Sequence, residues 1–281
     1  MKVKPELDLT DTMKANIEVH TRMADSYDHD EPHFRPENRA KVRGVLAALA
    51  KRTNGGRLVD LGCGTGFVIN LARDLFERID GVDVTPAMLA KIDTSDGKVF
   101  LHKSSVEKLP FDDNSFDMAS SYAFLHHVVD HLAILREAYR VLKPGGLLYV
   151  DLEPNKLFWQ KMVELDADKS RTYSDIVARE IQSVLYTDEK VEEDFGIPSQ
   201  TFRDAEPIKS VLGGFDPYVF EKEARDLGFT SVEIIPDWYL GQGSILHGQS
   251  EQAATIVDDY LRRAMPLTTH LYKYLRFILV K

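Results

Sequence analysis

Three glycines at alternate positions follow a short apolar segment near residue 60, and this arrangement constrains the fold more than any other feature of the chain. Residues 57–61 (RLVDL) have the composition of a buried strand, and Gly62, Gly64 and Gly66 come directly after it. The apolar spacing of a helix begins at Val68. A glycine-rich turn between a strand and a helix lets a ligand approach the backbone N–H groups closely. The segment therefore predicts a strand–turn–helix unit that binds a nucleotide-bearing small molecule.

Strands and helices continue to alternate as far as residue 153. This alternation predicts an α/β fold with a doubly wound, mostly parallel sheet that helices cover on both faces. The expected strands span 57–61, 79–84, 98–102, 116–121, 147–150, 230–235 and 272–280. The expected helices begin near 37, 68, 85, 130, 158, 174 and 217, with a further one around 256–261, and 193–207 has the composition of a polar tract with prolines.

The residues around the glycines distinguish between nucleotide ligands. The phosphate-binding loop of NTPases needs Lys-Ser or Lys-Thr after its glycines, and a dinucleotide fingerprint needs a glycine where Phe67 stands. Asp60 ends the first strand, where its carboxylate would face a cationic group. Asp83 ends the second strand, where it can bind both ribose hydroxyls. A cationic aminoacyl group together with a ribose describes S-adenosylmethionine.

Four segments carry a resemblance to a known family. In chain order they are VDLGCGTGF, GVDVTPAML, SSVEKLPFDDNSFDMASSYAFLHHV and LREAYRVLKPGGLLYVDLEPN. They resemble the successive motifs of class I S-adenosylmethionine-dependent methyltransferases, and most of all the branch that includes ubiquinone and menaquinone C-methyltransferases. The resemblance covers residues 37–153 and resumes weakly at 217–235. It implies a Rossmann-like, seven-stranded sheet in the order 3-2-1-4-5-7-6, with 272–280 as its antiparallel last strand.

The resemblance also implies how the cofactor is bound. Asp60, Gly62 and Gly64 would line the methionine end of S-adenosylmethionine. Asp83 would hold the ribose hydroxyls, and Val84 would pack on the adenine.

Four further residues complete the expected cofactor site. Ser105 and Val106 stand where the family usually has Asp-Ala, so the usual carboxylate near the adenine amino group is missing. Tyr27 resembles a family tyrosine that reaches over the cofactor from an N-terminal helix. Tyr122, in the motif after the fourth strand, is expected at the same site.

The chain divides into a core and cap segments according to this pattern. Residues 37–153 form the expected cofactor-binding core, and 217–281 complete its sheet. Residues 1–36, a helical insertion at 154–216 and a second insertion at 236–270 are expected to form a cap over the sheet, because irregular stretches of this length are usually functional.

Two strand ends carry the candidate catalytic residues. His126 follows the fourth strand and Glu153 follows the fifth, and these ends are neighbours in a sheet ordered 1-4-5. Either residue could remove a proton from a hydroxyl or C–H acceptor, with His126 favoured because an imidazole titrates near neutrality. Asp151 and Glu153, two apart on one strand, are expected to share a face. His127 and His131 are four apart, but the glutamate of a zinc motif is absent, so no metal is expected.

Composition limits the partners. The chain of 281 residues has a net charge of −10 and no dense basic block, which argues against a nucleic-acid partner. It has one cysteine, no signal-peptide pattern and no apolar run of membrane-spanning length, so we expect a cytoplasmic protein with no membrane partner. The expected activity is methyl transfer to a small-molecule acceptor. Alternatives are a non-catalytic S-adenosylmethionine-binding regulator or a methyltransferase acting on a macromolecule, and the sequence leaves the attacking atom and the oligomeric state open.

Overall fold

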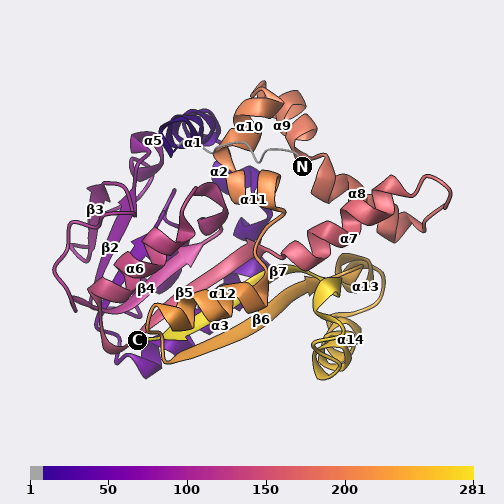
Figure 1. The fold of residues 1–281 in the computed structure, drawn as a ribbon. Coiled ribbons are helices and arrows are strands. Elements are labelled where there is room, and N and C mark those ends of the chain that lie inside the picture. Colours follow the sequence, from indigo (N-terminus) through magenta and orange to yellow (C-terminus); the bar gives the residue numbers. More distant parts are fainter. Residues whose placement is uncertain (1–8) are drawn as a thin grey trace.

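The computed structural model describes residues 9–281, which build a seven-stranded sheet in the order β3-β2-β1-β4-β5-β7-β6 (Figure 1). The pairs β1–β2, β1–β4, β2–β3 and β4–β5 are parallel, whereas β7 runs antiparallel to both β5 and β6. The sheet order and the antiparallel last strand expected from the sequence are thus confirmed. The strands are β1 Arg57–Leu61, β2 Arg78–Asp83, β3 Val99–Lys103, β4 Phe116–Tyr122, β5 Leu142–Pro154, β6 Ser231–Tyr239 and β7 Tyr272–Val280.

Helices cover both faces of this sheet. On one face, α3 (Pro36–Arg52) and α4 (Phe67–Ala72) bury apolar side chains against β1, β2 and β4. On the other face, α6 (His131–Val141) and α12 (Pro217–Asp226) pack against β5 and β7. Two apolar layers on opposite faces define the doubly wound arrangement.

Most of the remaining helices lie outside these layers (Figure 1), although Ile208 of α11 belongs to one apolar layer and Leu89 of α5 packs on the other. α1 packs on α9 and α10 through a small apolar cluster, and α7 packs on α8 through another. No helix formed by residues 9–281 has the length and apolar character needed to cross a bilayer. Besides α3, α4, α6 and α12, the helices are α1 Leu9–Met23, α2 Tyr27–Asp30, α5 Pro86–Leu89, α7 Lys156–Ala167, α8 Asp175–Leu185, α9 Thr187–Phe195, α10 Ser199–Ala205, α11 Pro207–Leu212, α13 Gln242–Gly248 and α14 Glu251–Arg263.

Two segments differ from their expected structure. The polar tract 193–207 includes the end of α9, all of α10 and the start of α11. Its buried residues, such as Ile197 and Phe202, are too few to produce a helical period in the sequence. β5 begins at Leu142 instead of residue 147, because Leu142 pairs with Phe116 and carries the strand through the Pro144–Gly146 turn.

An irregularity in β5 separates two carboxylates that were expected on one face. Leu152 has a φ of +59°, and the register between β5 and β7 shifts between Val150 and Glu153. Asp151 accepts a hydrogen bond from Arg276 on β7, whereas Glu153 accepts from the loop after β4. The prediction of a shared face is wrong because the bulge interrupts the alternation on which it depended.

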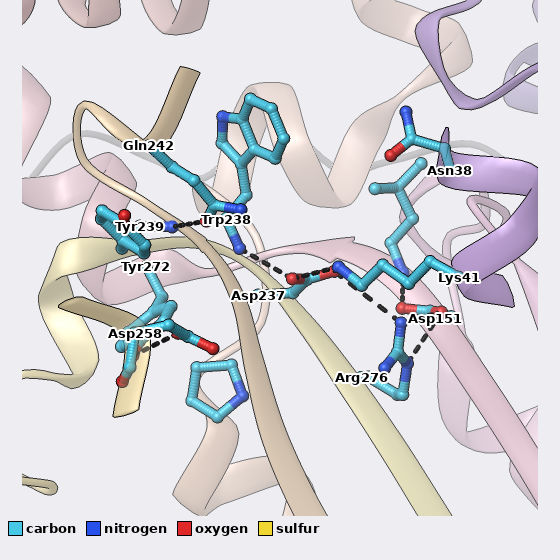
Figure 2. Close-up of polar contacts among 12 residues, drawn as sticks. Asn38, Lys41, Asp151, Asp237, Trp238, Tyr239, Gln242, Asp258, Tyr272 and Arg276 are labelled. Carbon is cyan, nitrogen blue, oxygen red and sulfur yellow. Dashed lines mark hydrogen bonds and ion pairs between the residues drawn. The ribbon is translucent and has the colours of Figure 1, made fainter. Parts of the chain in front are cut away.

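Asp151 belongs to a buried polar network that joins three strands and α3 (Figure 2). Arg276 Nε lies 2.8 Å from Asp151 Oδ2, and the Tyr149 hydroxyl donates to the same carboxylate. The Arg276 guanidinium also lies 3.7 Å from Asp237, which binds Lys41 of α3. Asp151 and Arg276 are only 2% and 6% exposed, so water screens their attraction weakly. This network fixes β5, β6 and β7 against α3, outside the candidate site.

Candidate cofactor and acceptor cavities

The carboxyl ends of β1, β2 and β4 open onto a cavity of about 1020 Å³ that is partly open to solvent, here called the first cavity. Parallel strands bring their carboxyl ends to one edge of the sheet, which explains why segments far apart in sequence meet there. All nine residues expected to bind the cofactor line it. They are Tyr27, Asp60, Gly62, Gly64, Asp83, Val84, Ser105, Val106 and Tyr122.

Gly62 and Gly64 of the turn are required for different structural reasons. Gly64 has a φ of +50°, and a Cβ there would meet no atom within 4 Å, so its backbone lies open to the first cavity. Gly62 has a φ of +69°, and a Cβ there would lie 2.1 Å from the ring of Phe124. Packing against Phe124 therefore requires Gly62, whereas Gly64 provides the close approach that a ligand needs.

Asp60 supplies a buried carboxylate at the end of β1. It is 2% exposed, and Ser120 Oγ donates to its Oδ1 at 2.7 Å. Burial raises the pKa of Asp60 to about 7, the charge of Asp83 adds to this effect, and the Ser120 hydrogen bond opposes it. A carboxylate in such surroundings gains most from an approaching cation. The site therefore fits the ammonium group at the methionine end of S-adenosylmethionine.

Asp83 and Glu107 place two more carboxylates along the first cavity. Asp83 accepts the N–H of Gly64 at 3.0 Å and the N–H of Thr85 at 2.8 Å, which fixes the orientation of its carboxylate. Glu107 Oε2 lies 3.3 Å from the hydroxyl of Ser105. Glu107 was not among the expected site residues, although it stands two positions after the serine that replaces the family aspartate.

A contact between the N-terminal segment and the glycine turn was also not expected. The buried Thr65 donates through Oγ1 to Asp28 Oδ1 at 2.5 Å. Asp28 belongs to α2, so this bond holds the adjacent Tyr27 at the first cavity. The sequence pointed to this segment through Tyr27, but Thr65, the partner of Asp28, lies 37 residues away, beyond the reach of any local pattern.

A second cavity of about 990 Å³ adjoins the first. Its walls come from α1, α2, the 3₁₀ turns at 32–34 and 125–127, the end of β5, α7 to α11 and β7. Within residues 9–281, none of 236–270 lines either cavity. Five residues line both cavities and so form the boundary between them: His20, Tyr27, His33, Ala123 and His127.

His126 and Glu153 form a pair at the second cavity, from the two strand ends that the sequence placed side by side. His126 Nδ1 lies 2.9 Å from Glu153 Oε2. The fully buried Glu153 also accepts the N–H groups of Phe124, Leu125 and His126 at 2.9–3.1 Å. Four donors therefore occupy this carboxylate. His126 lines the second cavity, whereas Glu153 lies behind it and lines neither cavity.

Three residues that the sequence did not connect surround this pair. His127 Nδ1 lies 2.9 Å from the carbonyl oxygen of Ala205, and burial lowers the pKa of His127 well below its usual value. Glu206 Oε1 lies 3.9 Å from His126 Nε2, and Glu206 Oε2 lies 2.6 Å from Lys209 Nζ. The start of α11 thus brings an ion pair to the imidazoles, across about 80 residues of sequence.

His127 and His131 do not form a pair, although they are four apart in sequence. His127 ends a short 3₁₀ turn, and His131 begins α6 after a break in the helical path. His131 Nε2 instead bonds Glu223 Oε2 of α12 at 2.8 Å.

Comparison with known proteins identifies the family of the chain. The family described as "Methyltransferase domain" matches residues 59–150. The demethylmenaquinone methyltransferase of Listeria welshimeri is 31% identical over 166 residues, which cover 55% of this chain and 70% of that protein. The 27-O-demethylrifamycin SV methyltransferase of Amycolatopsis mediterranei is 32% identical over 130 residues, 43% of this chain and 47% of that protein, so this chain matches less than half of its length.

The chain belongs to the class I S-adenosylmethionine-dependent methyltransferases. Its cofactor is S-adenosylmethionine. A solved S-adenosylmethionine-dependent methyltransferase from Mesorhizobium loti superposes with a TM-score of 0.52 at 18% identity, over 85% of this chain and 96% of that one, which shows that the fold is shared. The family match ends at residue 150, so helices α7 to α11 lie outside it.

Proposed function

We propose that the protein transfers a methyl group from S-adenosylmethionine in the first cavity to a small-molecule acceptor in the second. One observation carries this proposal: the two cavities share a wall of five residues, including Tyr27 and His127. Methyl transfer requires the two reactants to meet in line at about 3 Å in a site protected from water. Adjacent cavities with a common boundary meet this requirement.

The chain's own groups bind and orient the cofactor in this proposal. S-adenosylmethionine supplies a methyl group on a positively charged sulfur. Asp60 binds the ammonium group, Asp83 binds the ribose hydroxyls, and Val84 and Val106 pack on the adenine. Glu107 provides the carboxylate near the adenine that Ser105 lacks.

The pair of His126 and Glu153 prepares the acceptor. A carboxylate can only accept, so the hydrogen bond from Nδ1 fixes the proton on that nitrogen and leaves the lone pair on Nε2. His126 Nε2 takes the proton of a hydroxyl or acidic C–H, and the acceptor atom bonds to the methyl carbon as the carbon–sulfur bond breaks. Glu153, whose carboxylate is occupied by four donors, orients the imidazole and stabilises its charged form instead of acting as a second base.

Several features support a small acceptor. The relatives are named for demethylmenaquinone and a demethylrifamycin, both small molecules. The second cavity of about 990 Å³ is enclosed by α1 and by the helices of 154–216, which form the cap in this proposal. The acidic balance of the chain disfavours nucleic acid.

The test is single-turnover transfer with S-adenosylmethionine and a panel of phenols and hydroxyquinones, with S-adenosylhomocysteine as the readout. His126→Asn should lower the rate about 10²- to 10⁴-fold with little change in cofactor affinity. His131→Asn is the matched control, because His131 also bonds a glutamate but lines neither cavity. An unchanged rate in His126→Asn would refute the base assignment.

Two other outcomes would favour the alternatives. Tight cofactor binding with no transfer to any member of the panel, or to RNA or protein, would favour a regulatory protein. Transfer to RNA or protein in preference to the panel would favour a macromolecular acceptor. Binding of NADH without S-adenosylmethionine would contradict the proposal as a whole.

A further inference from the structure

The wall of the second cavity brings together two imidazoles and a carboxylate. His126 and His127 lie on the 3₁₀ turn after β4, and Glu206 precedes α11. One ligand atom from each of the three lies within 4.8 Å of the other two, and His126 Nε2 lies 3.9 Å from Glu206 Oε1. These residues are buried or half-buried, and they converge from segments that are separated by about 80 residues.

Both imidazoles have their other nitrogen held in place. His126 Nδ1 faces the Glu153 carboxylate and His127 Nδ1 faces the Ala205 carbonyl, each at 2.9 Å. Both partners only accept hydrogen bonds, so each Nδ1 carries the proton and each Nε2 keeps its lone pair. Histidines that bind a metal almost always donate their second N–H to a carboxylate or a backbone carbonyl in this way. We propose that His126, His127 and Glu206 bind a divalent cation of the Zn²⁺ class, which regulates the site.

The donor set selects the ion. Two imidazole nitrogens and one carboxylate oxygen are the ligands of zinc sites that keep a fourth position open. That position faces a cavity of about 990 Å³, which has room for water or an acceptor oxygen. Mg²⁺ and Ca²⁺ prefer oxygen ligands throughout, so the cluster favours Zn²⁺ over both.

Neighbouring charges tune the affinity. Lys209 Nζ lies 2.6 Å from Glu206 Oε2, and its positive charge disfavours binding of a metal cation nearby. The other carboxylate oxygen, Glu206 Oε1, faces His126. The carboxylates of Glu153, behind His126, and Glu31, in the same cavity wall, favour a cation. Removal of the Lys209 charge should therefore strengthen metal binding, an effect that a merely structural Glu206–Lys209 pair would not produce.

The regulatory consequence rests on the proposed function. The cation and the acceptor's proton compete for the same lone pair on His126 Nε2. An occupied cluster cannot accept the proton, so Zn²⁺ inhibits transfer in competition with the acceptor, and a chelator restores the rate.

The first experiment is calorimetric titration of the full chain with Zn²⁺ in the absence of acceptor. One ion should bind per chain, Glu206→Gln should weaken binding by at least about tenfold, and Lys209→Gln should tighten it. Glu223→Gln is the matched control, because Glu223 bonds His131 away from the cavities and its loss should leave binding unchanged. Co²⁺ in place of Zn²⁺ should give the visible absorption of a four-coordinate site, and Glu206→Gln should reduce it.

The titration does not depend on methyl transfer, so its failure is distinguishable from failure of the proposed function. Zn²⁺ affinity that is equal in wild type, Glu206→Gln and Lys209→Gln would overturn the site. Zn²⁺ that binds at the cluster but accelerates transfer, or that inhibits without competition from the acceptor, would overturn the regulatory role.

Discussion

The raised pKa of Asp60 predicts that cofactor affinity depends on pH near neutrality. Burial places this pKa at about 7, so the carboxylate is half ionised at that pH before the cofactor binds. An ammonium group binds the ionised form, and the ionised fraction rises from about one tenth at pH 6 to about nine tenths at pH 8. The affinity for S-adenosylmethionine should therefore increase about tenfold over this range, which corresponds to about 1.4 kcal/mol.

Calorimetry in buffers of different ionisation enthalpy measures both the affinity and the proton count. About half a proton should leave Asp60 for each cofactor bound at pH 7. Asp60→Asn keeps the shape of the side chain and should remove both the pH dependence and the proton release. 5′-Methylthioadenosine, which lacks the aminoacyl end, should bind wild type with no such dependence. A tenfold increase that persists in Asp60→Asn would refute the reasoning.

The same shift has a cost for the protein without ligand. The pKa of Asp60 lies about 3 units above the ordinary value of 3.8, so ionisation inside the fold opposes folding by up to about 4 kcal/mol above pH 7. This cost is absent below about pH 4 and grows as the pH rises from there through 7. Asp60→Asn should therefore raise the free energy of unfolding by up to about 4 kcal/mol at pH 8 but by less than half as much, about 1.6 kcal/mol, at pH 5. Equal effects at both pH values in urea titrations would contradict the pKa shift.

Three further predictions concern residues around the cavities and the sheet. Gly62→Ala should lower the free energy of unfolding by about 2–4 kcal/mol, because a Cβ would lie 2.1 Å from the Phe124 ring. In a Phe124→Ala background, most of this cost should disappear. Equal costs in urea titrations of both backgrounds would contradict this explanation. Arg276→Met should lower the free energy of unfolding by about 3–5 kcal/mol, and by more at pH 8 than at pH 5. The reason is that burial raises the pKa of Asp151 and the charge of Arg276 opposes that rise. A loss of stability that does not depend on pH would argue against the Asp151–Arg276 ion pair. Thr65→Val should weaken S-adenosylmethionine binding about fivefold in calorimetry by releasing α2, and unchanged affinity would show that α2 does not contribute.

The sequence by itself was sufficient for the fold and for many of the residues that line the first cavity. The alternation of strands and helices predicted a mostly parallel sheet covered on both faces, and the resemblance to a known family implied the order of its strands. All nine expected residues line the first cavity, since each one stands at or just after a strand end or in a short local motif. A local sequence pattern is enough to predict that such residues lie close together, because a parallel sheet brings the carboxyl ends of its strands to one edge.

Tertiary structure alone decided the second cavity and the surroundings of His126. Glu206, Lys209 and Ala205 reach the imidazoles from helices with no recognisable motif, and packing of α10 on α1 and of Ile208 on the core places them there. The bulge at Leu152, which directs Asp151 and Glu153 to different partners, likewise leaves no mark on the alternation of residue types. Sequence patterns record the period of an element, whereas contacts between distant elements depend on side-chain fit and charge pairing, which arise only when the whole chain is packed.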